Sequence, residues 1–369
     1  MLFEPIGNFK VGILFDEFEY VGYGDEIRRI PLAIYYPSDD TLGKTPCQYA
    51  FKELFQLRSA NNVTHKTLTH CFEDVPVSSI EKKYPVVFYH CGYGGHIMEN
   101  TVLCSDLASL GYVIVSVGHP GECSGIRYKD GTIRFIEKEY IDAMENPKLF
   151  EDIGPLFEAF KVTDENEDEK LIDMGRDFFA KQDCFGKRIK IWTKDNSAAA
   201  DYIKKINNSE VESILNDKLD LDKGFAVTGH SFGGATAIEV CLKDSRFVCG
   251  LNMDGGNFGD NYGSDIKKPY LALGNPFIWK MLKAVFLNNS NDSYHITVND
   301  SGHLGFTDSL YLDRSEEGLE RIGNRNPLEF RELKTAYHKC FYDKYLLKMD
   351  VKITDVKFND IKYYEKVSH

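Results

Sequence analysis

The sequence lacks a long apolar run, a closely spaced cysteine pair and an excess of positive charge. None of its apolar stretches is long enough to span a membrane, and the first ten residues have neither the charged nor the apolar part of a signal peptide. No two cysteines are spaced as CxxC, the usual half of a structural zinc site. We therefore expect no transmembrane segment, no secretion signal and no structural zinc.

Positive charge is scarce relative to negative charge. The chain has 44 lysines and arginines against 57 acidic residues, which gives a net charge of −13. A surface of this sign repels the phosphates of nucleic acids and anionic bilayers, so neither is an expected partner. The substrate should be neutral, zwitterionic or bound through apolar contacts. The sequence does not indicate an oligomeric state.

Disulfide bonds are not expected either. The nine cysteines are an odd number and lie mostly within apolar runs, as Cys104 and Cys241 do. This pattern is typical of buried free thiols in a reducing compartment, and it predicts a cytoplasmic location. His65, His70 and Cys71 are close in the sequence, but a polar loop accounts for them better than a metal site does.

The chain is organised around Gly229–Gly234, which reads GHSFGG and fits the pattern G-x-S-x-G. An apolar run at 224–228 precedes it, and a segment with helical spacing at 235–242 follows it. A buried strand, a tight turn and a helix in this order form the nucleophile elbow of an α/β-hydrolase, which makes Ser231 the expected nucleophile. Glycines flank the serine because side chains there would collide with the neighbouring strand and helix. The alternative is a glycine-rich turn that contains a serine by chance.

The rest of the chain fits the same fold class, α/β, with a mostly parallel central sheet, helices on both faces and an inserted helical lid. Compact apolar runs predict strands that are buried in such a sheet. We expect strands at about 9–23, 30–37, 85–89, 112–117, 224–228, 247–253, 270–273 and 294–298. We expect helices at about 50–58, 100–110, 189–206, 235–242 and 334–347, and a short hairpin or strand after 349.

Residues 122–187 fit no core element of this fold. Their apolar side chains recur at roughly helical spacing, and an acidic run at 164–169 divides them into two pieces. We therefore predict an α/β-hydrolase core, 1–121 and 188–369, and an inserted lid, 122–187, that forms a wall of the acyl pocket. A surface for a partner or a membrane is the alternative, although most stripes of this spacing are ordinary core.

Two more residues complete a Ser–acid–His set with Ser231. Asp254 follows the strand predicted at 247–253, and His303 follows the strand predicted at 294–298. The order serine, acid, histidine is that of this fold, and residues that follow parallel strands meet at one edge of the sheet. We expect His303 to act as the general base and Asp254 to orient it.

Asp254 is the least obvious of these assignments, because the acid more commonly follows the next strand. Here that strand leads to Asn275, and no carboxylate follows until Asp292. The alternative is that Asp254 is a turn residue before Gly255. The reserve candidates for the acid lie on loops and are Asp260, Asp265 and Asp300.

A glycine-rich turn at 90–96 follows the strand predicted at 85–89. Hydrolases of this fold place an oxyanion-binding N–H there, and we expect Tyr93 to supply it because glycines on both sides free its backbone. A phosphate-binding loop is excluded, since G-x-x-x-x-G-K-S/T is absent. His119 follows another strand and is expected near the pocket mouth, as a hydrogen-bonding residue rather than a base.

These motifs resemble a known family. Residues 229–236 (GHSFGGAT), Asp254, and Gly302-His303 with Phe306 are similar to the secreted platelet-activating-factor acetylhydrolases and their bacterial relatives. The similarity covers 30–37, about 84–117 and 188–308, and neither the lid nor the tail. It implies a calcium-independent serine hydrolase that removes short or oxidised acyl groups from glycerophospholipids.

The resemblance gives triad roles to Ser231, Asp254 and His303, and it makes the backbone N–H groups of Tyr93 and Phe232 the oxyanion donors. This mechanism requires no metal or organic cofactor. The sequence departs from the animal enzymes at 255–256, where two glycines replace bulkier residues, and in its long lid.

Three other readings remain open. A dienelactone-hydrolase-like enzyme would have the same fold, but its elbow would contain cysteine in place of Ser231. A general carboxylesterase, a peptidase or a polyester esterase would share the triad and differ in substrate. A non-catalytic binding protein on this scaffold would be expected to lose a triad residue, and all three are present.

Overall fold

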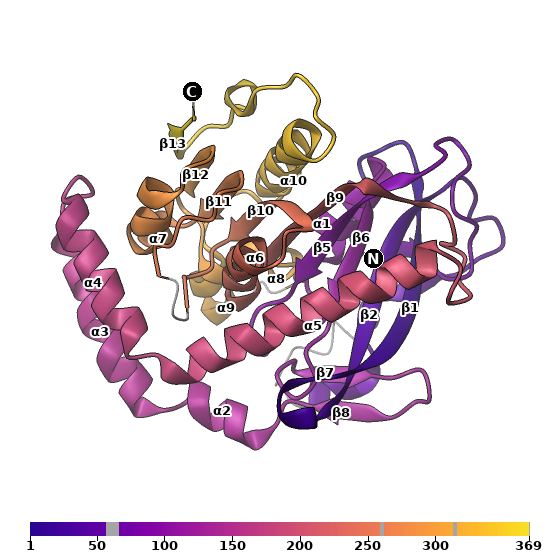
Figure 1. Cartoon of the computed structure of the whole chain (residues 1–369), viewed down its shortest axis with the longest axis horizontal. Coiled ribbons are helices and arrows are strands. Elements are labelled where there is room, and N and C mark those ends of the chain that lie inside the picture. Colours follow the sequence, from indigo (N-terminus) through magenta and orange to yellow (C-terminus); the bar gives the residue numbers. More distant parts are fainter. Residues whose placement is uncertain (57–65, 259–261, 313–315, 369) are drawn as a thin grey trace.

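One sheet of 11 strands runs through the part of the molecule that the structure describes. The computed structural model describes residues 1–56, 66–258, 262–312 and 316–368. The strand order is β13-β12-β11-β10-β9-β5-β6-β2-β1-β4-β3. Helices lie on both faces of this sheet, whose centre is parallel, so the expected α/β-hydrolase class is confirmed (Figure 1).

The parallel centre of the sheet contains the strands that the apolar runs predict. In spatial order these are β6 (Val113–Val117), β5 (Tyr84–His90), β9 (Leu219–His230), β10 (Phe247–Met253), β11 (Tyr270–Gly274) and β12 (Ser293–Val298). Helices pack on both faces, so almost every side chain of β5, β6 and β11 is buried. This explains why each of these strands reads as an unbroken apolar run rather than as an alternating pattern.

Further strands, most of them paired antiparallel, extend the sheet at both edges. The two predicted strands at this edge are β2 (Ile27–Ser38), which pairs with β6, and β1 (Lys10–Val21), which pairs with β2. Beyond them lie β4 (Leu68–Phe72) and β3 (Pro46–Gln48), which are too short to show a pattern in the sequence. At the other edge β13 (Ile361–Lys366) pairs with β12, which confirms a strand in the tail.

Two groups of helices enclose the sheet. α1 (Thr101–Ser109) and α10 (Pro327–Tyr345) share one hydrophobic core, and α5 (Asp183–Asn207), α6 (Phe232–Lys243) and α7 (Pro276–Asn288) contribute to the other (Figure 1). The short elements α8 (Ser309–Leu312) and α9 (Glu316–Ile322) lie between β12 and α10. The helix expected at 50–58 is a 3-10 turn at Lys52–Gln56. The last two residues of that prediction lie outside the described residues, as does His65.

The segment 122–187 contains more elements than the sequence predicts. It begins with a hairpin of β7 (Gly125–Arg127) and β8 (Ile133–Phe135) and continues into α2 (Lys138–Met144). Two amphipathic helices follow, α3 (Pro147–Val162) and α4 (Asp168–Ala180), and they form an arm beside α7 (Figure 1). Strands of three residues carry too little periodicity to be predicted. The division into core and lid stays a prediction, although α5 begins before its boundary at 187.

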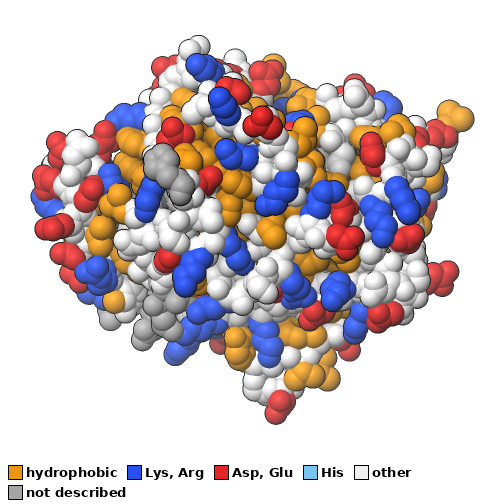
Figure 2. Space-filling view, turned by 45° about the horizontal axis from the view of Figure 1, so that its top comes forward, with side chains coloured by type: hydrophobic (Ala, Val, Ile, Leu, Met, Phe, Trp, Pro, Cys, Tyr) orange, Lys and Arg blue, Asp and Glu red, His pale blue; other side chains and the backbone are white. Residues whose placement is uncertain are grey.

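The surface charge and the length of the helices bear on the expectation that the chain binds no nucleic acid and has no transmembrane segment. On the face shown in Figure 2, basic and acidic side chains are interspersed, with apolar side chains between them. This face therefore carries no continuous basic patch of the kind that attracts nucleic acid. Among the helices of the described residues, none combines the length and the apolar character required to cross a bilayer.

Candidate active site

Ser231 lies between β9 and α6, where the elbow pattern places it. Its backbone has φ 55° and ψ −118°, which is a strained conformation for a residue with a side chain. The Ser231 N–H donates to the Met253 carbonyl at 2.8 Å, so the neighbouring strand β10 holds the turn. A Cβ on Gly229 would lie 2.4 Å from the Gly233 carbonyl oxygen, and one on Gly233 would lie 2.2 Å from the His90 oxygen. Both glycines are required by this close packing.

The side chains of Ser231, His303 and Asp254 form one hydrogen-bonded row. His303 Nε2 lies 2.9 Å from Ser231 Oγ, and His303 Nδ1 lies 2.6 Å from Asp254 Oδ2. Asp254 is buried, whereas the His303 side chain is 46% exposed. With Asp254 ionised, Nδ1 carries the proton and Nε2 accepts from the serine hydroxyl. The three strand ends therefore bring together the three residues that the sequence selects.

Asn275 is a hydrogen-bond partner of Asp254, a role that no sequence pattern indicates. Its backbone N–H donates to Asp254 Oδ1 at 2.7 Å, and its side-chain amide donates to Oδ2 at 3.1 Å. The amide oxygen of Asn275 accepts from the first turn of α7 and caps that helix. Of the alternative acids, Asp265 accepts from the backbone N–H of Ser290 at 2.8 Å, and Asp260 lies outside the described residues.

Glu99 and His230 contact His303 and the glycine-rich turn at 90–96. His230 Nε2 donates to the His303 carbonyl at 3.0 Å, and its Nδ1 lies 3.4 Å from Glu99 Oε1. That oxygen also accepts from the Gly92 N–H at 2.7 Å. Burial would raise the pKa of Glu99, but the bonds from His230 and Gly92 hold it below its ordinary value. Neither Glu99 nor His230 follows a sequence pattern that marks such a role.

Tyr93 and Phe232 lie against each other beside Ser231. Phe232 is the first residue of α6, and the first N–H groups of a helix have no acceptor within it. The rings of Tyr93 and Phe232 meet edge to face at 5.6 Å between centroids. A Cβ on Gly92 would lie 3.4 Å from the Ser231 Cβ, so the turn that contains Tyr93 touches the elbow. The two residues that the sequence analysis expects to donate to the oxyanion are therefore neighbours beside the elbow.

His119 is buried rather than at the pocket mouth, so that expectation was wrong. Its Nδ1 lies 2.8 Å from Asp195 Oδ2, and its Nε2 lies 3.1 Å from His90 Nδ1. Burial lowers the pKa of His119, although the bond to Asp195 opposes this shift. Its ring stacks on Trp192 at 3.7 Å, and Trp192 in turn meets the Phe232 ring at 4.9 Å. His119 therefore packs behind the elbow as a hydrogen-bonded core residue.

Glu122 is a second buried acid behind the site. Its Oε2 accepts from Trp192 Nε1 at 2.7 Å, and its backbone carbonyl accepts from the Gly94 N–H at 3.0 Å. Burial raises the pKa of Glu122 to about 7, and the Trp192 bond and the charge of Arg188 limit the rise. Through the Gly94 bond, Glu122 connects the start of the predicted lid to the loop that contains Tyr93.

A cavity of about 810 Å³ opens at Ser231, Asp254 and His303. Apart from these polar groups its walls are mostly apolar and come from the lid and from α7. The apolar lining residues are Leu156, Phe157, Phe160, Phe178, Phe258, Pro276, Phe277, Ile278 and Met281. Phe157 and Phe277 meet at 4.2 Å between ring centroids, so α3 and α7 close one side together. The volume and the lining suit a small apolar group beside the serine.

Comparisons with known proteins agree with this geometry. A family model for platelet-activating factor acetylhydrolase, isoform II, matches residues 4–315, a span that includes the lid. The platelet-activating factor acetylhydrolase of Gallus gallus is 26% identical over 282 residues, which cover 73% of this chain and 64% of that protein. The Bos taurus protein of that name is 27% identical, with coverage of 83% and 68%. The chain thus spans 64% of the length of the first relative.

The same fold occurs in a solved structure with a different substrate in its name. A ferulic acid esterase from Streptomyces cinnamoneus matches with a TM-score of 0.75 and 20% identity, and the match covers 98% of each chain. At this identity the likeness establishes the shared fold alone.

Proposed function

The chain belongs to the platelet-activating factor acetylhydrolase, isoform II, family, and from this premise we propose that it is a serine ester hydrolase that removes a short or oxidised acyl group from a lipid ester. The observation that carries the proposal is the row Ser231–His303–Asp254, with distances of 2.9 and 2.6 Å, at the floor of an apolar cavity. No metal or organic cofactor takes part in the mechanism.

In the first half of the reaction Ser231 Oγ attacks the ester carbonyl while His303 Nε2 takes the hydroxyl proton. Asp254, held by Asn275, orients the imidazole and stabilises its positive charge. The backbone N–H groups of Phe232 and Tyr93 bind the oxyanion, and a donor of this kind contributes about 3 kcal/mol. His303 then gives its proton to the leaving alcohol, which departs and leaves an acyl-serine.

In the second half a water molecule replaces the alcohol. His303 removes a proton from that water, which attacks the acyl-serine. Collapse of the second tetrahedral intermediate returns the proton to Ser231 and releases the carboxylic acid. The acyl chain would lie against the apolar side chains of α3 and α7, because these line the cavity that opens at Ser231.

Ser231 is tested by labelling and by substitution. We expect a fluorophosphonate to label the protein stoichiometrically at Ser231, and Ser231→Ala to abolish ester hydrolysis with the fold retained. Ser290→Ala, on an exposed turn, is the matched control and should leave labelling and rate unchanged. Labelling at a different serine, or a fully active Ser231→Ala, would exclude the mechanism.

The substrate class requires a separate measurement. Rates across p-nitrophenyl esters of increasing chain length, beside phospholipids with a short sn-2 acyl group, distinguish a lipid esterase from a general carboxylesterase or a polyester esterase. A steep preference for the short sn-2 phospholipid supports the proposal. Equal rates on simple esters and no phospholipid hydrolysis would favour a general carboxylesterase.

The free thiols support a cytoplasmic location for this enzyme. Eight cysteines of the described residues are free, and seven of these are buried. Buried unpaired thiols are typical of a reducing compartment. Subcellular fractionation with an antibody to the protein tests this, and recovery from the extracellular medium would contradict it.

A further inference from the structure

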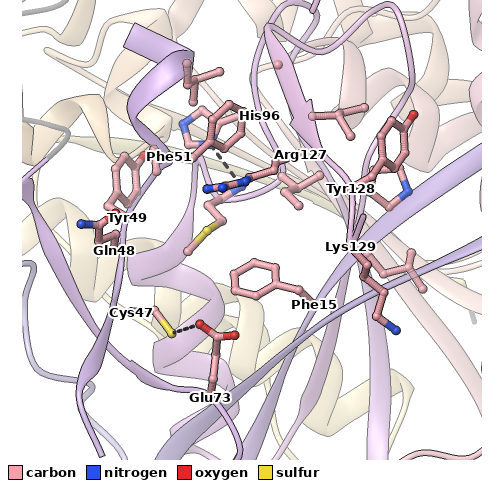
Figure 3. A pocket seen from close by; sticks show the side chains of 18 of the residues that line it. Phe15, Cys47, Gln48, Tyr49, Phe51, Glu73, His96, Arg127, Tyr128 and Lys129 are labelled. Atoms are coloured by element: carbon pink, nitrogen blue, oxygen red, sulfur yellow. Dashed lines mark hydrogen bonds between the residues drawn. The ribbon is translucent and has the colours of Figure 1, made fainter. Parts of the chain in front are cut away.

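A second cavity, of about 520 Å³, shares no lining residue with the cavity at Ser231. Figure 3 shows it from close by. Its walls come mostly from β1, from the segment 45–54, from the loop 96–98 and from the hairpin that opens the lid, 125–129, and Pro31, Leu32 and Glu73 complete them. These four segments are far apart in the sequence, and the proposed mechanism uses none of their side chains.

The cavity is lined by rings and other apolar groups over much of its surface. These are Phe15, Leu32, Tyr49, Phe51, Leu54, Ile97, Met98, Ile126 and Tyr128. A volume of this size with apolar walls and a few polar groups is typical of small-molecule sites. The rings of Phe15 and Phe51 face the open space in Figure 3, so an apolar body could contact both.

Arg127, the last residue of β7, places a positive charge in the lining of this cavity. Its guanidinium extends across the opening towards Phe51 and His96 (Figure 3). In the described part of the chain no carboxylate lies within ion-pair distance of it. The neighbouring Lys129, by contrast, pairs with Asp16 at 2.6 Å. The positive charge of Arg127 is therefore available to a ligand.

The acidic side chains of the cavity are paired or distant from Arg127. Asp16 accepts from Lys129 and from the Tyr202 hydroxyl at 2.9 Å, and Glu17 pairs with Arg29. Glu73 accepts from the Cys47 thiol at 3.4 Å, on the side of the cavity opposite Arg127 (Figure 3). An anion beside Arg127 would therefore lie across the cavity from Glu73.

We propose that this cavity is a second ligand site, which binds an amphipathic anion. A single carboxylate or phosphate pairs with the planar guanidinium of Arg127, which can donate two parallel hydrogen bonds to such a group. The apolar body of the ligand lies against Phe15, Met98 and Ile126. The site is independent of Ser231, so it does not rest on the proposed catalytic mechanism.

The test compares four ligands that share one chain and differ in head group: octanoate, octyl phosphate, octanol and octylammonium. We expect calorimetry to give tighter binding for the two anions, and their ratio distinguishes a carboxylate ligand from a phosphate ligand. Arg127→Gln should weaken anion binding at least about tenfold. Arg134→Gln is the matched control, because Arg134 lies on the partner strand β8 and does not line the cavity.

A photoreactive octanoate that carries a diazirine locates the site. We expect labelled peptides that contain Phe15, Met98 or Ile126 in the wild type and in Arg134→Gln, and much weaker labelling of these peptides in Arg127→Gln. Label confined to the cavity at Ser231 would overturn the proposal. So would tighter binding of octylammonium than of octanoate, which would assign the cavity to cations through Glu73.

Discussion

Asn275 holds Asp254 from two directions and caps α7 with the same side chain. Its backbone and side-chain N–H groups donate to the two oxygens of Asp254 at 2.7 and 3.1 Å. Its amide oxygen accepts from Phe277 N–H at 2.9 Å, which fixes the amide so that its NH₂ group faces the carboxylate. Asn275 occupies the position where the triad acid more commonly lies, and here it orients Asp254, which follows the preceding strand of the chain.

Asp254→Asn should lower kcat by about 10⁴-fold, as loss of the acid does in related triads. The amide cannot stabilise the imidazolium by charge, and it favours the wrong tautomer of His303. Rates on p-nitrophenyl acetate, with circular dichroism to confirm the fold, measure this effect. Asp300→Asn, a reserve candidate for the acid, should retain full activity. The reverse pattern would move the acid to Asp300.

Two substitutions at Asn275 separate capping from orientation. Asn275→Ser keeps a good cap for α7 but removes the side-chain donor to Asp254, so we expect unchanged stability and a fall in kcat of about tenfold. Asn275→Ala removes both and should in addition lose about 1 kcal/mol of stability. Thermal unfolding and steady-state rates of both variants provide the comparison. Equal kcat for Asn275→Ser and the wild type would show that the backbone bond suffices.

Phe157→Ala should change the preference for acyl length. The Phe157 side chain lines the cavity and is 40% exposed. Its loss therefore removes apolar contacts to long acyl chains without leaving a void in the hydrophobic core. We expect kcat/KM for an octanoate ester to fall about fivefold relative to an acetate ester, which corresponds to about 1 kcal/mol. Val162→Ala, on the exposed end of α3, is the control. An unchanged ratio would place the acyl chain elsewhere.

Glu122 should make stability depend on pH. Burial raises its pKa from 4.5 to about 7, so the folded protein retains this proton to a higher pH than the unfolded chain does. The resulting stabilisation is complete below about pH 4.5 and is lost as the pH rises through 7. Glu122→Gln removes the titration, so its melting temperature relative to the wild type should be higher at pH 8 than at pH 5. An identical difference at both values, as expected for the exposed Glu139→Gln, would contradict this.

Local patterns predict the strands, the elbow and the triad because each depends on neighbouring residues. Parallel strands end at one edge of the sheet, so Asp254 and His303 follow from strand order without knowledge of packing. The burial of His119 cannot be predicted in this way, because it depends on Asp195, which lies 76 positions further along the chain on α5. The bonds of Glu99 to Gly92 and of Asn275 to Asp254 also arise from tertiary packing, so no sequence pattern marks them.

The close packing of the glycines around Ser231 also bears on how this protein could diverge. Even a methyl group at Gly229 or Gly233 would overlap backbone atoms of the neighbouring segment, so the elbow tolerates almost no variation. The proposed acyl cavity, by contrast, takes much of its wall from α3, where Phe157 is part of the exposed surface. Substitutions in α3 and α7 could therefore alter the proposed substrate range while the elbow around Ser231 stays the same.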